Sequence, residues 1–313
     1  MVRAAFFAFL LLVSFGTRAD QGLPFETVQV AERVYALVGE LGQRSPKNLG
    51  NNMTAGFVIA DDAVVVIDTG GSRAGAEAIH RAVRKLTDKP IRWVVNTGGQ
   101  DHRWLGNDYF LREPGVSVVA AATGKQDMIA RTAQQVGMAK SNLGESFAGT
   151  KPAYPTLTFE DRYVLPVKGV RIELIYSGGG HTLGDIFVWL PEGRIVFTGD
   201  IVFADRLLGL PPGMGQRWIR ALEYLRDEIR PTVVVPGHGR VTDLEHALHD
   251  SYDYLVYLRD SARRAFDEGA FDPVEATQRL DQSRFAYLAN FSDAPMRSRN
   301  ALHMAEEMVA AIR

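Results

Sequence analysis

Short apolar runs separated by polar, glycine-containing turns dominate the 313-residue chain. Runs of this kind that are rich in Val and Ile predict β-strands, and nearly continuous apolar runs predict strands covered on both faces. The runs at 55–60 and 63–70 are joined by a short turn and predict a central hairpin. In all, we expect strands at residues 28–30, 34–38, 55–60, 63–70, 91–95, 116–121, 170–176, 186–190, 194–198 and 233–235.

Segments with an apolar face at helical spacing lie between and after these strands. Ser72 is a typical helix N-cap, and Ala76, Ile79, Val83 and Leu86 share one face of the helix that follows it to about Leu86. Further helices are predicted at residues 125–136, 216–229, 244–268, 273–280 and 297–312.

Two halves that each combine strands with helices predict an α/β fold. We expect a four-layer αββα sandwich, in which two sheets pack face to face and helices cover their outer faces. Residues 20–313 are then a single domain, with residues 244–313 as a helical C-terminal extension packed on it.

The net charge and the absence of cysteine limit the partners and metal sites that the protein can have. The formal net charge of -2 gives no reason to expect nucleic acid or an anionic membrane surface as the main partner. Because the chain has no cysteine, disulfides and thiolate metal sites are excluded, and any metal must be held by His, Asp or Glu. The seven histidines are the whole supply of imidazole.

The N-terminus has the layout of a secretory signal peptide at residues 1–19. Arg3 supplies the positive end, an apolar run follows from Ala4 to Phe15, and Thr17 and Ala19 are small residues at a cleavage site after Ala19. The alternative is a membrane anchor, but a spanning helix needs about 20 apolar residues and this run is shorter. We therefore expect a secreted or periplasmic protein with no membrane anchor after cleavage.

Two polar segments are predicted to border a pocket. Residues 39–52 are rich in Gly and Asn, and residues 137–155 form a polar stretch that contains Gly144, Gly149 and Pro152. We expect both to be loops, the second a mobile rim, and to carry substrate specificity.

Polar turns with chemistry-bearing residues follow four predicted strands. In sheets of this kind ligands bind outside the carboxyl ends of the strands, so we expect these turns to lie together. An isolated histidine after a strand is usually a surface or hydrogen-bonding residue, and only the combination indicates a metal site. The turns are Asn96–Asn107 with Asp101 and His102, Ser177–Asp185 with His181, Gly199-Asp200, and Pro236–Gly239 with His238.

Three of these motifs resemble metal-binding motifs of the metallo-β-lactamase superfamily. They are Gly180-His181-Thr182-Leu183-Gly184-Asp185, Phe197-Thr198-Gly199-Asp200 and Val235-Pro236-Gly237-His238-Gly239. Their order and spacing, together with Ile67-Asp68-Thr69-Gly70, extend the resemblance over roughly residues 28–245. Within the superfamily, the Asn96–Trp104 loop resembles that of exported quinoprotein relay system zinc metallohydrolases, a subgroup related to a sulfur-oxidation protein.

The resemblance implies a metallo-β-lactamase type of sandwich and a role for each matching residue. His181 is expected to be a ligand of a first metal site, Asp200 a carboxylate that bridges two sites, and His238 a ligand of the second. Asp68 and Asp185 are expected to hydrogen-bond backbone or to orient a ligand.

The loop after Asn96 departs from the family pattern and allows two alignments. Without a gap, Gly98 and Gln100 replace the two histidines of the first site, while His102 and Arg103 replace the Asp and His of the second. With a shift of one residue, Asp101 and His102 keep the Asp-His pair.

We favour the shifted alignment because it supplies ligands. Asp101, His102, Asp200 and His238 would surround one ion with His181 nearby, a set that suits zinc and is tolerable for iron or manganese. An Arg103 cation about 4 Å from a dication would cost about 2 kcal/mol in water and about 8 kcal/mol at an effective dielectric of about 20. We therefore expect that Arg103 points away from the metal or that no metal binds, and we predict one ion rather than two.

The predicted function is an exported metal-dependent hydrolase of a small-molecule substrate. The ion would activate water, with Asp101 or Asp200 holding it as the catalytic carboxylate. The alternative is a non-catalytic periplasmic accessory protein of a quinoprotein system that binds a metal or cofactor on the same scaffold. A third, weaker alternative is a structural protein with an empty site. The remaining histidines, His80, His246, His249 and His303, are expected to be solvated.

Overall fold

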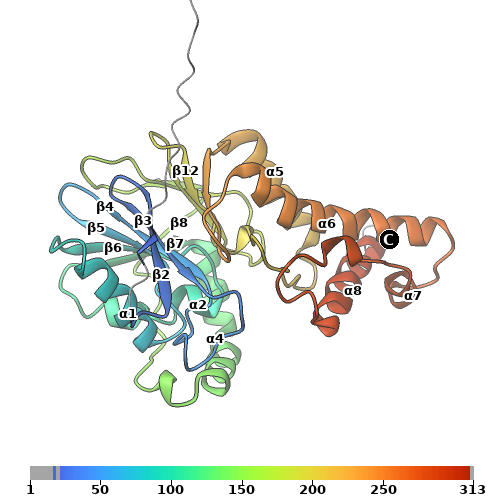
Figure 1. Cartoon of the computed structure of the whole chain (residues 1–313), viewed down its shortest axis with the longest axis horizontal. Coiled ribbons are helices and arrows are strands. Elements are labelled where there is room, and N and C mark those ends of the chain that lie inside the picture. The colour runs from blue at the N-terminus through green and yellow to red at the C-terminus, as the bar shows by residue number, and fades with distance from the viewer. Residues whose placement is uncertain (1–16, 19–21, 311–313) are drawn as a thin grey trace, which may run out of the picture.

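The computed structural model describes residues 17–18 and 22–310, which include two β-sheets lying face to face (Figure 1). The N-terminal sheet has eight strands in chain order, and its strands β5, β6, β7 and β8 run parallel to one another. They are β1 (Thr17–Arg18), β2 (Phe25–Ala31), β3 (Val34–Gly39), β4 (Thr54–Ile59), β5 (Val64–Ile67), β6 (Ile91–Val95), β7 (Ser117–Ala121) and β8 (Leu157–Phe159).

The second sheet has five strands in the order β13-β12-β11-β10-β9. Strands β12 and β13 are parallel, whereas the remaining neighbours are antiparallel. The strands are β9 (Arg162–Val164), β10 (Glu173–Tyr176), β11 (Ile186–Leu190), β12 (Ile195–Phe197) and β13 (Val233–Val235).

Helices cover both outer faces. On the N-terminal sheet, Ser72 caps α1 as predicted, because its hydroxyl accepts a hydrogen bond from the amide of Gly75 at 3.0 Å. The helices are α1 (Arg73–Arg84), α2 (Asp101–Trp104), α3 (Asn107–Phe110), α4 (Ala122–Leu143), α5 (Gly215–Tyr224), α6 (Leu244–Asp267), α7 (Pro273–Gln278) and α8 (Ala294–Ala310). Short helical turns are η1 (Gly144–Phe147), η2 (Gly199–Ile201), η3 (Leu225–Ile229) and η4 (Ser283–Phe285).

Three apolar clusters separate the layers. Val66 and Val94 pack against Ile79 of α1, while Val65 and Val95 on the opposite face of the same sheet pack against Val188 of the second sheet. The outer face of the second sheet packs on α5 and α6, in a cluster that also includes α8. Alternate residues of one strand thus enter different clusters, as expected for a sheet buried on both faces. The predicted αββα sandwich with C-terminal helices is confirmed.

The prediction of a loop at residues 137–155 is wrong for its first part. Helix α4 continues to Leu143, and η1 follows directly. Ala139 and Leu143 extend the buried face of α4, and a Cβ atom at Gly137 would meet nothing within 4 Å. Packing of this face therefore outweighs the cost of about 1 kcal/mol that a glycine imposes inside a helix.

Helices α6, α7 and α8 extend away from the sheets (Figure 1). Tyr254 and Leu258 of α6 and Met304 of α8 share a cluster with Trp218 of α5, so these helices pack against one another and on the sandwich. Of the predicted signal peptide, all but Thr17 and Arg18 lie outside the described residues; those two pair with β2. Within residues 22–310, no helix combines the length and apolar character needed to cross a membrane.

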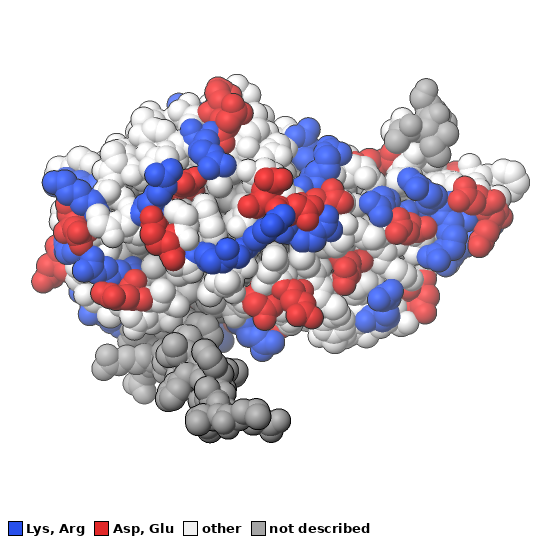
Figure 2. Space-filling view, turned by 90° about the horizontal axis from the view of Figure 1, so that it is seen from above, with Lys and Arg blue, Asp and Glu red and all other residues white. Residues whose placement is uncertain are grey.

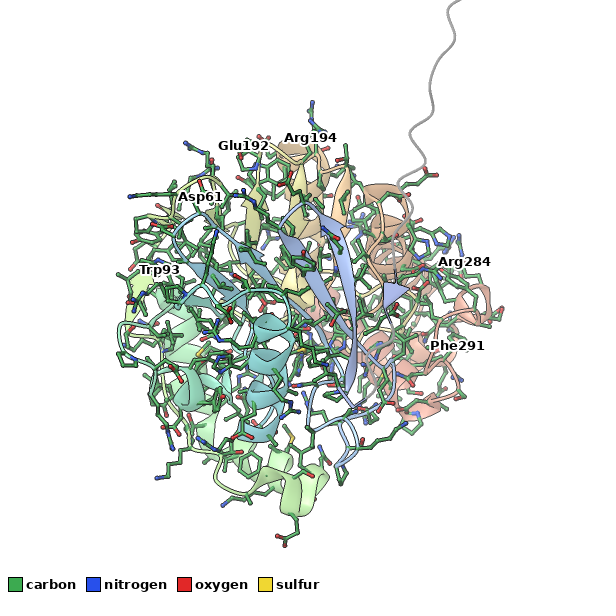
Figure 3. All side chains as sticks on the ribbon, turned by 60° about the vertical axis from the view of Figure 1, so that its left-hand side comes forward. Asp61, Trp93, Glu192, Arg194, Arg284 and Phe291 are labelled. Atoms are coloured by element: carbon green, nitrogen blue, oxygen red, sulfur yellow. The ribbon has the colours of Figure 1, made fainter. Side chains whose placement is uncertain are left out.

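The turns between antiparallel strands mark one end of the sandwich. Asp61 lies in the turn before β5, and Glu192 and Arg194 lie in the turn before β12; Figure 3 shows all three at the same end of the molecule. The carboxyl ends of β5, β6, β12 and β13 therefore open at the opposite end, where the polar turns were predicted to meet.

Candidate metal centre

Three of the predicted ligands converge at the carboxyl ends of three strands. His102 lies on α2 after β6, Asp200 on η2 after β12, and His238 in the turn after β13. Nε2 of His238 is 3.2 Å from Oδ1 of Asp200, and Nε2 of His102 is 3.3 Å from Oδ2. One ligand atom from each lies within 4.8 Å of the others, and all three side chains are buried. We call His102, Asp200 and His238 the triad.

Buried polar side chains hold α2 in place. The amide nitrogen of Asn96 donates to the carbonyl of Arg103 at 2.8 Å and to Oδ1 of Asn107 at 3.0 Å. Asp68, at the end of β5, accepts from the backbone amide of Thr97 at 2.8 Å and from its hydroxyl at 2.7 Å. Because these groups are buried and paired, the turn that carries His102 has a defined conformation.

The turn that carries His238 requires glycine on both sides. Gly239 has φ +96°, a conformation that other residues rarely adopt, and a Cβ atom there would lie 2.0 Å from the carbonyl oxygen of Ala204. At Gly237 a Cβ atom would lie 2.6 Å from Nη2 of Arg103. The close approach lets His238 pair with the backbone of Phe203 and brings its ring against the Phe203 ring, with centroids 4.5 Å apart.

Arg103 points into this centre, so the expectation that it points away is wrong. Its Nη2 donates to Oδ1 of Asp200 at 2.6 Å and to the carbonyl of Gly237 at 2.7 Å, and its Nη1 donates to Oδ2 of Asp68 at 2.8 Å. The electrostatic cost estimated above is that of an unpaired cation beside a metal ion. It does not apply to Arg103, because the carboxylates of Asp68 and Asp200 share its charge. The two carboxylates outweigh the effect of burial and raise the pKa of Arg103 above its ordinary value.

Asp101 faces away from the triad. Its Oδ1 accepts from Nη2 of Arg44 at 2.5 Å and lies 3.2 Å from Nδ1 of His102. Burial would raise the pKa of this carboxyl, but Arg44 and His102 lower it below its usual range. Both alignments place His102 at the centre, but Arg103 on Asp200 and Asp101 outside the triad match the alignment without a gap. The predicted roles of Asp101 as ligand and catalytic carboxylate stay predictions.

His181 lies beside the triad rather than in it. Its ring packs edge-on against Trp218, with centroids 5.1 Å apart, and its Nδ1 has no hydrogen-bond partner among the described residues. Burial lowers the pKa of His181 to about 4, so the imidazole is neutral at neutral pH. Its predicted role as a ligand stays a prediction.

The space of a first-site histidine at position 98 is filled. A Cβ atom on Gly98 would lie 2.2 Å from Oδ1 of Asp185. That carboxylate is held by Thr182, whose amide donates to Oδ2 at 2.6 Å and whose hydroxyl donates to Oδ1. Gln100 accepts from Nη1 of Arg131 at 3.1 Å. Asp185 therefore occupies the place where a histidine side chain at position 98 would start.

Restoring a histidine at position 98 tests this packing. Gly98→His is expected to lower the free energy of unfolding by about 1 to 3 kcal/mol, the usual cost of overpacking, without adding a metal ion. Urea unfolding and metal analysis measure both effects. Gly137→His is the matched control and should not destabilise, because its Cβ meets no atom within 4 Å. A Gly98→His protein of normal stability that binds an additional ion would contradict this account.

The electrostatics suit a divalent cation at the triad. Burial would raise the pKa of the Asp200 carboxyl, but Arg103, His102 and His238 together hold it well below its ordinary value, so Asp200 is ionised. Burial and the nearby Arg206 cation lower the pKa of His238 well below its ordinary value, so its imidazole is neutral. Metals bind carboxylates and neutral imidazoles.

The tautomer of His238 also fits a metal ligand. Its Nδ1 is 2.9 Å from the carbonyl oxygen of Asn52, which can only accept, and 3.1 Å from Nη1 of Arg206, which can only donate. We assign the proton to Nδ1 from the shorter contact, which leaves a lone pair on Nε2 toward the Asp200 carboxylate, where a cation would be bound by both. Oδ2 of Asp200 is buried without a hydrogen-bond partner among the described residues. Two imidazoles and a carboxylate suit zinc, and also iron.

A cavity of about 130 Å³ opens beside the triad. The predicted pocket segment 39–52 contributes Gln43, Arg44 and Asn52, whereas residues 137–155 contribute nothing among the described lining residues. Arg206 and Met296 also line the cavity, and sequence patterns did not indicate either one. The lining residues are Gln43, Arg44, Asn52, Gln100, His102, His181, Phe203, Arg206, Leu207, Gly209, His238 and Met296.

A second group with metal-ligand residue types lies outside the cavity. Nε2 of His246, which was expected to be solvated, is 3.1 Å from Oδ1 of Asp205 and 3.2 Å from Oδ2 of Asp250. Asp250 also accepts from the hydroxyl of Tyr287 at 3.0 Å and from the backbone amide of Asp205 at 2.6 Å. This cluster therefore serves as a hydrogen-bonded anchor for the residue that precedes Arg206.

The chain belongs to the metallo-β-lactamase superfamily, because the model of that family matches residues 51–268. Among solved structures, a metallo-β-lactamase from Pontibacter korlensis is similar over 74% of this chain and 99% of its own, with a TM-score of 0.58 and 21% identity. The sec-alkylsulfatase Pisa1 from Pseudomonas sp. is similar over 90% of this chain and 49% of its own, with a TM-score of 0.68 and 16% identity. Identities this low support the shared fold alone.

Curated relatives include two kinds of enzyme. A linear primary-alkylsulfatase from Pseudomonas sp. (strain ATCC 19151) is 22% identical over 72% of this chain and 49% of its own length. A metallo-beta-lactamase type 2 from Bacillus sp. (strain 170) is 27% identical over 59% of this chain and 66% of its own length. The chain thus spans about half the length of the alkylsulfatase and just under two thirds of the lactamase.

Proposed function

We propose that the protein is a metal-dependent hydrolase of a small molecule, with one ion held by His102, Asp200 and His238. The observation that carries the proposal is the convergence of these three buried side chains within 4.8 Å beside a cavity. The superfamily and the hydrolase names of two relatives support the reaction class. Zinc is the proposed metal, and iron or manganese are alternatives.

Each residue of the centre has a proposed task. When bound, the ion would lower the pKa of a coordinated water and polarise an ester or acyl oxygen of the substrate. Asp200 presents Oδ2 to the ion, because Arg103 already occupies Oδ1 at 2.6 Å. Nδ1 of His102 lies 2.8 Å from Nη2 of Arg44 and 3.2 Å from Oδ1 of Asp101, so these two residues together hold the ring with Nε2 toward Asp200. We propose this positioning role for Asp101 and the water-holding role for Asp200.

One ion rather than two is supported by the other side of the centre. Of the residues expected at a first site, Gly98 has no ligand atom and Gln100 is hydrogen-bonded to Arg131, which leaves His181 and the shared Asp200 carboxylate. One imidazole and one shared carboxylate are too few for a divalent cation, which usually needs at least three protein ligands.

Export through residues 1–19 and association with a periplasmic quinoprotein system are also part of the proposal. They rest on the N-terminal sequence pattern and on the Asn96–Trp104 loop. The accessory-protein alternative keeps the same metal centre without turnover.

A substrate panel tests the reaction. The metal-loaded protein is expected to hydrolyse at least one of a sulfate ester, a phosphate ester, a lactone, a thioester and a β-lactam, at a rate that falls at least about a hundredfold with a chelator. Asp200→Asn should lose the same activity, while Asp108→Asn, which changes a surface carboxylate paired with Arg112, should keep it. Metal binding without turnover of any class would instead favour the accessory protein.

A further inference from the structure

The described lining of the cavity beside the triad carries positively charged but no negatively charged side chains. Its described lining residues include Arg44 and Arg206 and three histidines, but no Asp or Glu. Arg44 is paired with Asp101 at 2.5 Å, whereas no carboxylate among the described residues lies within ion-pair distance of Arg206. Elsewhere the signs are mixed: the face in Figure 2 intersperses Lys and Arg with Asp and Glu. The positive charge at the cavity is therefore a local feature.

Arg206 is buried without an adequate partner. The residue is 6% exposed, and its Nε has no hydrogen-bond partner among the described residues. Its Nη1 lies 3.1 Å from Nδ1 of His238. In the tautomer assigned above this nitrogen carries a proton for Asn52 and cannot accept, so the contact does not satisfy Arg206. A buried guanidinium in this state is costly unless a ligand supplies the missing acceptors.

Three other residues that line the same cavity also carry orphaned polar atoms. Nε of Arg44, Oδ1 of Asn52 and Nδ1 of His181 are buried and lack hydrogen-bond partners among the described residues. Native proteins leave few buried polar atoms unpaired, so several around one cavity indicate a polar ligand. Phe203, Leu207 and Met296 supply apolar surface beside them.

The backbone holds Arg206 in place from both sides. The backbone carbonyl of Asp205 accepts a hydrogen bond from the amide of Ala289 at 2.9 Å. The amide of Leu207 donates to the backbone carbonyl of Ala289, also at 2.9 Å. Asp205 is also anchored through Asp250 and His246. The segment before α8 thus fixes the position of the arginine, which favours a recognition role over a flexible surface charge.

We propose that Arg206, assisted by Arg44, binds an oxyanion group of the substrate, such as a sulfate, phosphate or carboxylate. The inference rests on the proposed function for the reacting bond, but anion binding itself requires no turnover. Arginine presents several donors in a planar fork that matches oxyanions. The cavity of about 130 Å³ admits a small anionic head with a short apolar part.

Calorimetric titration of the full-length protein with inorganic sulfate, phosphate and acetate tests this proposal. Wild type is expected to bind at least one of them, and Arg206→Gln should weaken that binding at least about tenfold. Arg206→Lys should restore part of the affinity because it keeps the charge. Arg112→Gln is the matched control: it removes the same charge from a half-exposed side chain that does not line the cavity, and should leave affinity within about twofold.

The anion that binds most tightly distinguishes sulfate, phosphate and carboxylate substrates. Repeating the titration with a chelator separates the two proposals, since Arg206-dependent binding should persist without metal even if hydrolysis is never found. Absence of binding by wild type, or equal affinity in wild type, Arg206→Gln and Arg112→Gln, would overturn the inference. If Arg206→Gln fails to fold, equal affinity in wild type and Arg206→Lys for all three anions would also count against it, because lysine lacks the bidentate fork.

Discussion

Replacing Arg103 with methionine is expected to lower the free energy of unfolding by about 3 to 5 kcal/mol, as measured by urea unfolding at neutral pH. The methionine fills similar length but leaves Asp68 and Asp200 buried without their shared cation. Removing one partner of a buried ion pair is costly because the remaining charge has lost its solvation and its partner.

The pH dependence of this loss identifies its cause. In wild type the pKa of Asp200 lies well below 3.8, so its contribution to stability is present above about pH 4 and is lost as pH falls through the lower, folded-state pKa. In the Arg103→Met variant, burial without the guanidinium raises the pKa of Asp200. The free energy of unfolding therefore falls increasingly as pH rises above about 4, because the carboxyl must ionise without a partner. The difference between the two proteins should therefore grow from acid to neutral pH.

Arg112→Met provides the control for the Arg103 substitution. Arg112 is half exposed and pairs with Asp108 at 2.5 Å on the surface. Exposed ion pairs contribute at most about 1 kcal/mol, so this variant should stay close to wild type at every pH. Equal destabilisation of the two variants would show that Arg103 is not an electrostatic anchor.

Replacing His238 with alanine is expected to remove the metal. One of three ligands is lost, and affinity should fall by more than about a hundredfold, since even groups that only support a ligand cost 10- to 100-fold. Metal analysis after dialysis measures the change, and hydrolysis should disappear with the ion. His80→Ala is the matched control, because His80 is hydrogen-bonded to Tyr109 at 2.9 Å on the far side of α1. A His238→Ala protein that keeps its metal would exclude the triad as the site.

Much of the fold could be predicted from hydrophobic patterns. The strand at Ile91–Val95 and the Ser72 cap of α1 were predicted and are present, because local propensity, burial and capping agree there. Helix α4 extends beyond its predicted end because tertiary packing of Leu143 outweighs Gly137, which no local pattern reveals. The short helix α2 was not predicted, because it depends on the buried hydrogen bonds of Asn96, which no local pattern reveals.

The centre was predicted in part. His102, Asp200 and His238 come together because each follows a strand whose carboxyl end opens at one edge. The direction of Arg103 was wrong because it depends on Asp68, a residue distant in sequence that shares its charge.

No sequence pattern indicated that Arg206 lies at the cavity, because its position depends on backbone pairing with Ala289 in the C-terminal segment. The role of Arg44 likewise requires knowing that Asp101 turns toward it. Both contacts are long-range, and neither follows from residue spacing.

The most direct test of the account is the metal content of the purified protein and of two variants. Wild type and His181→Ala should each bind one ion per chain, whereas His102→Ala should bind none, because the triad and not His181 holds the metal. Two ions per chain in wild type, or loss of the ion in His181→Ala with retention in His102→Ala, would contradict the one-metal centre.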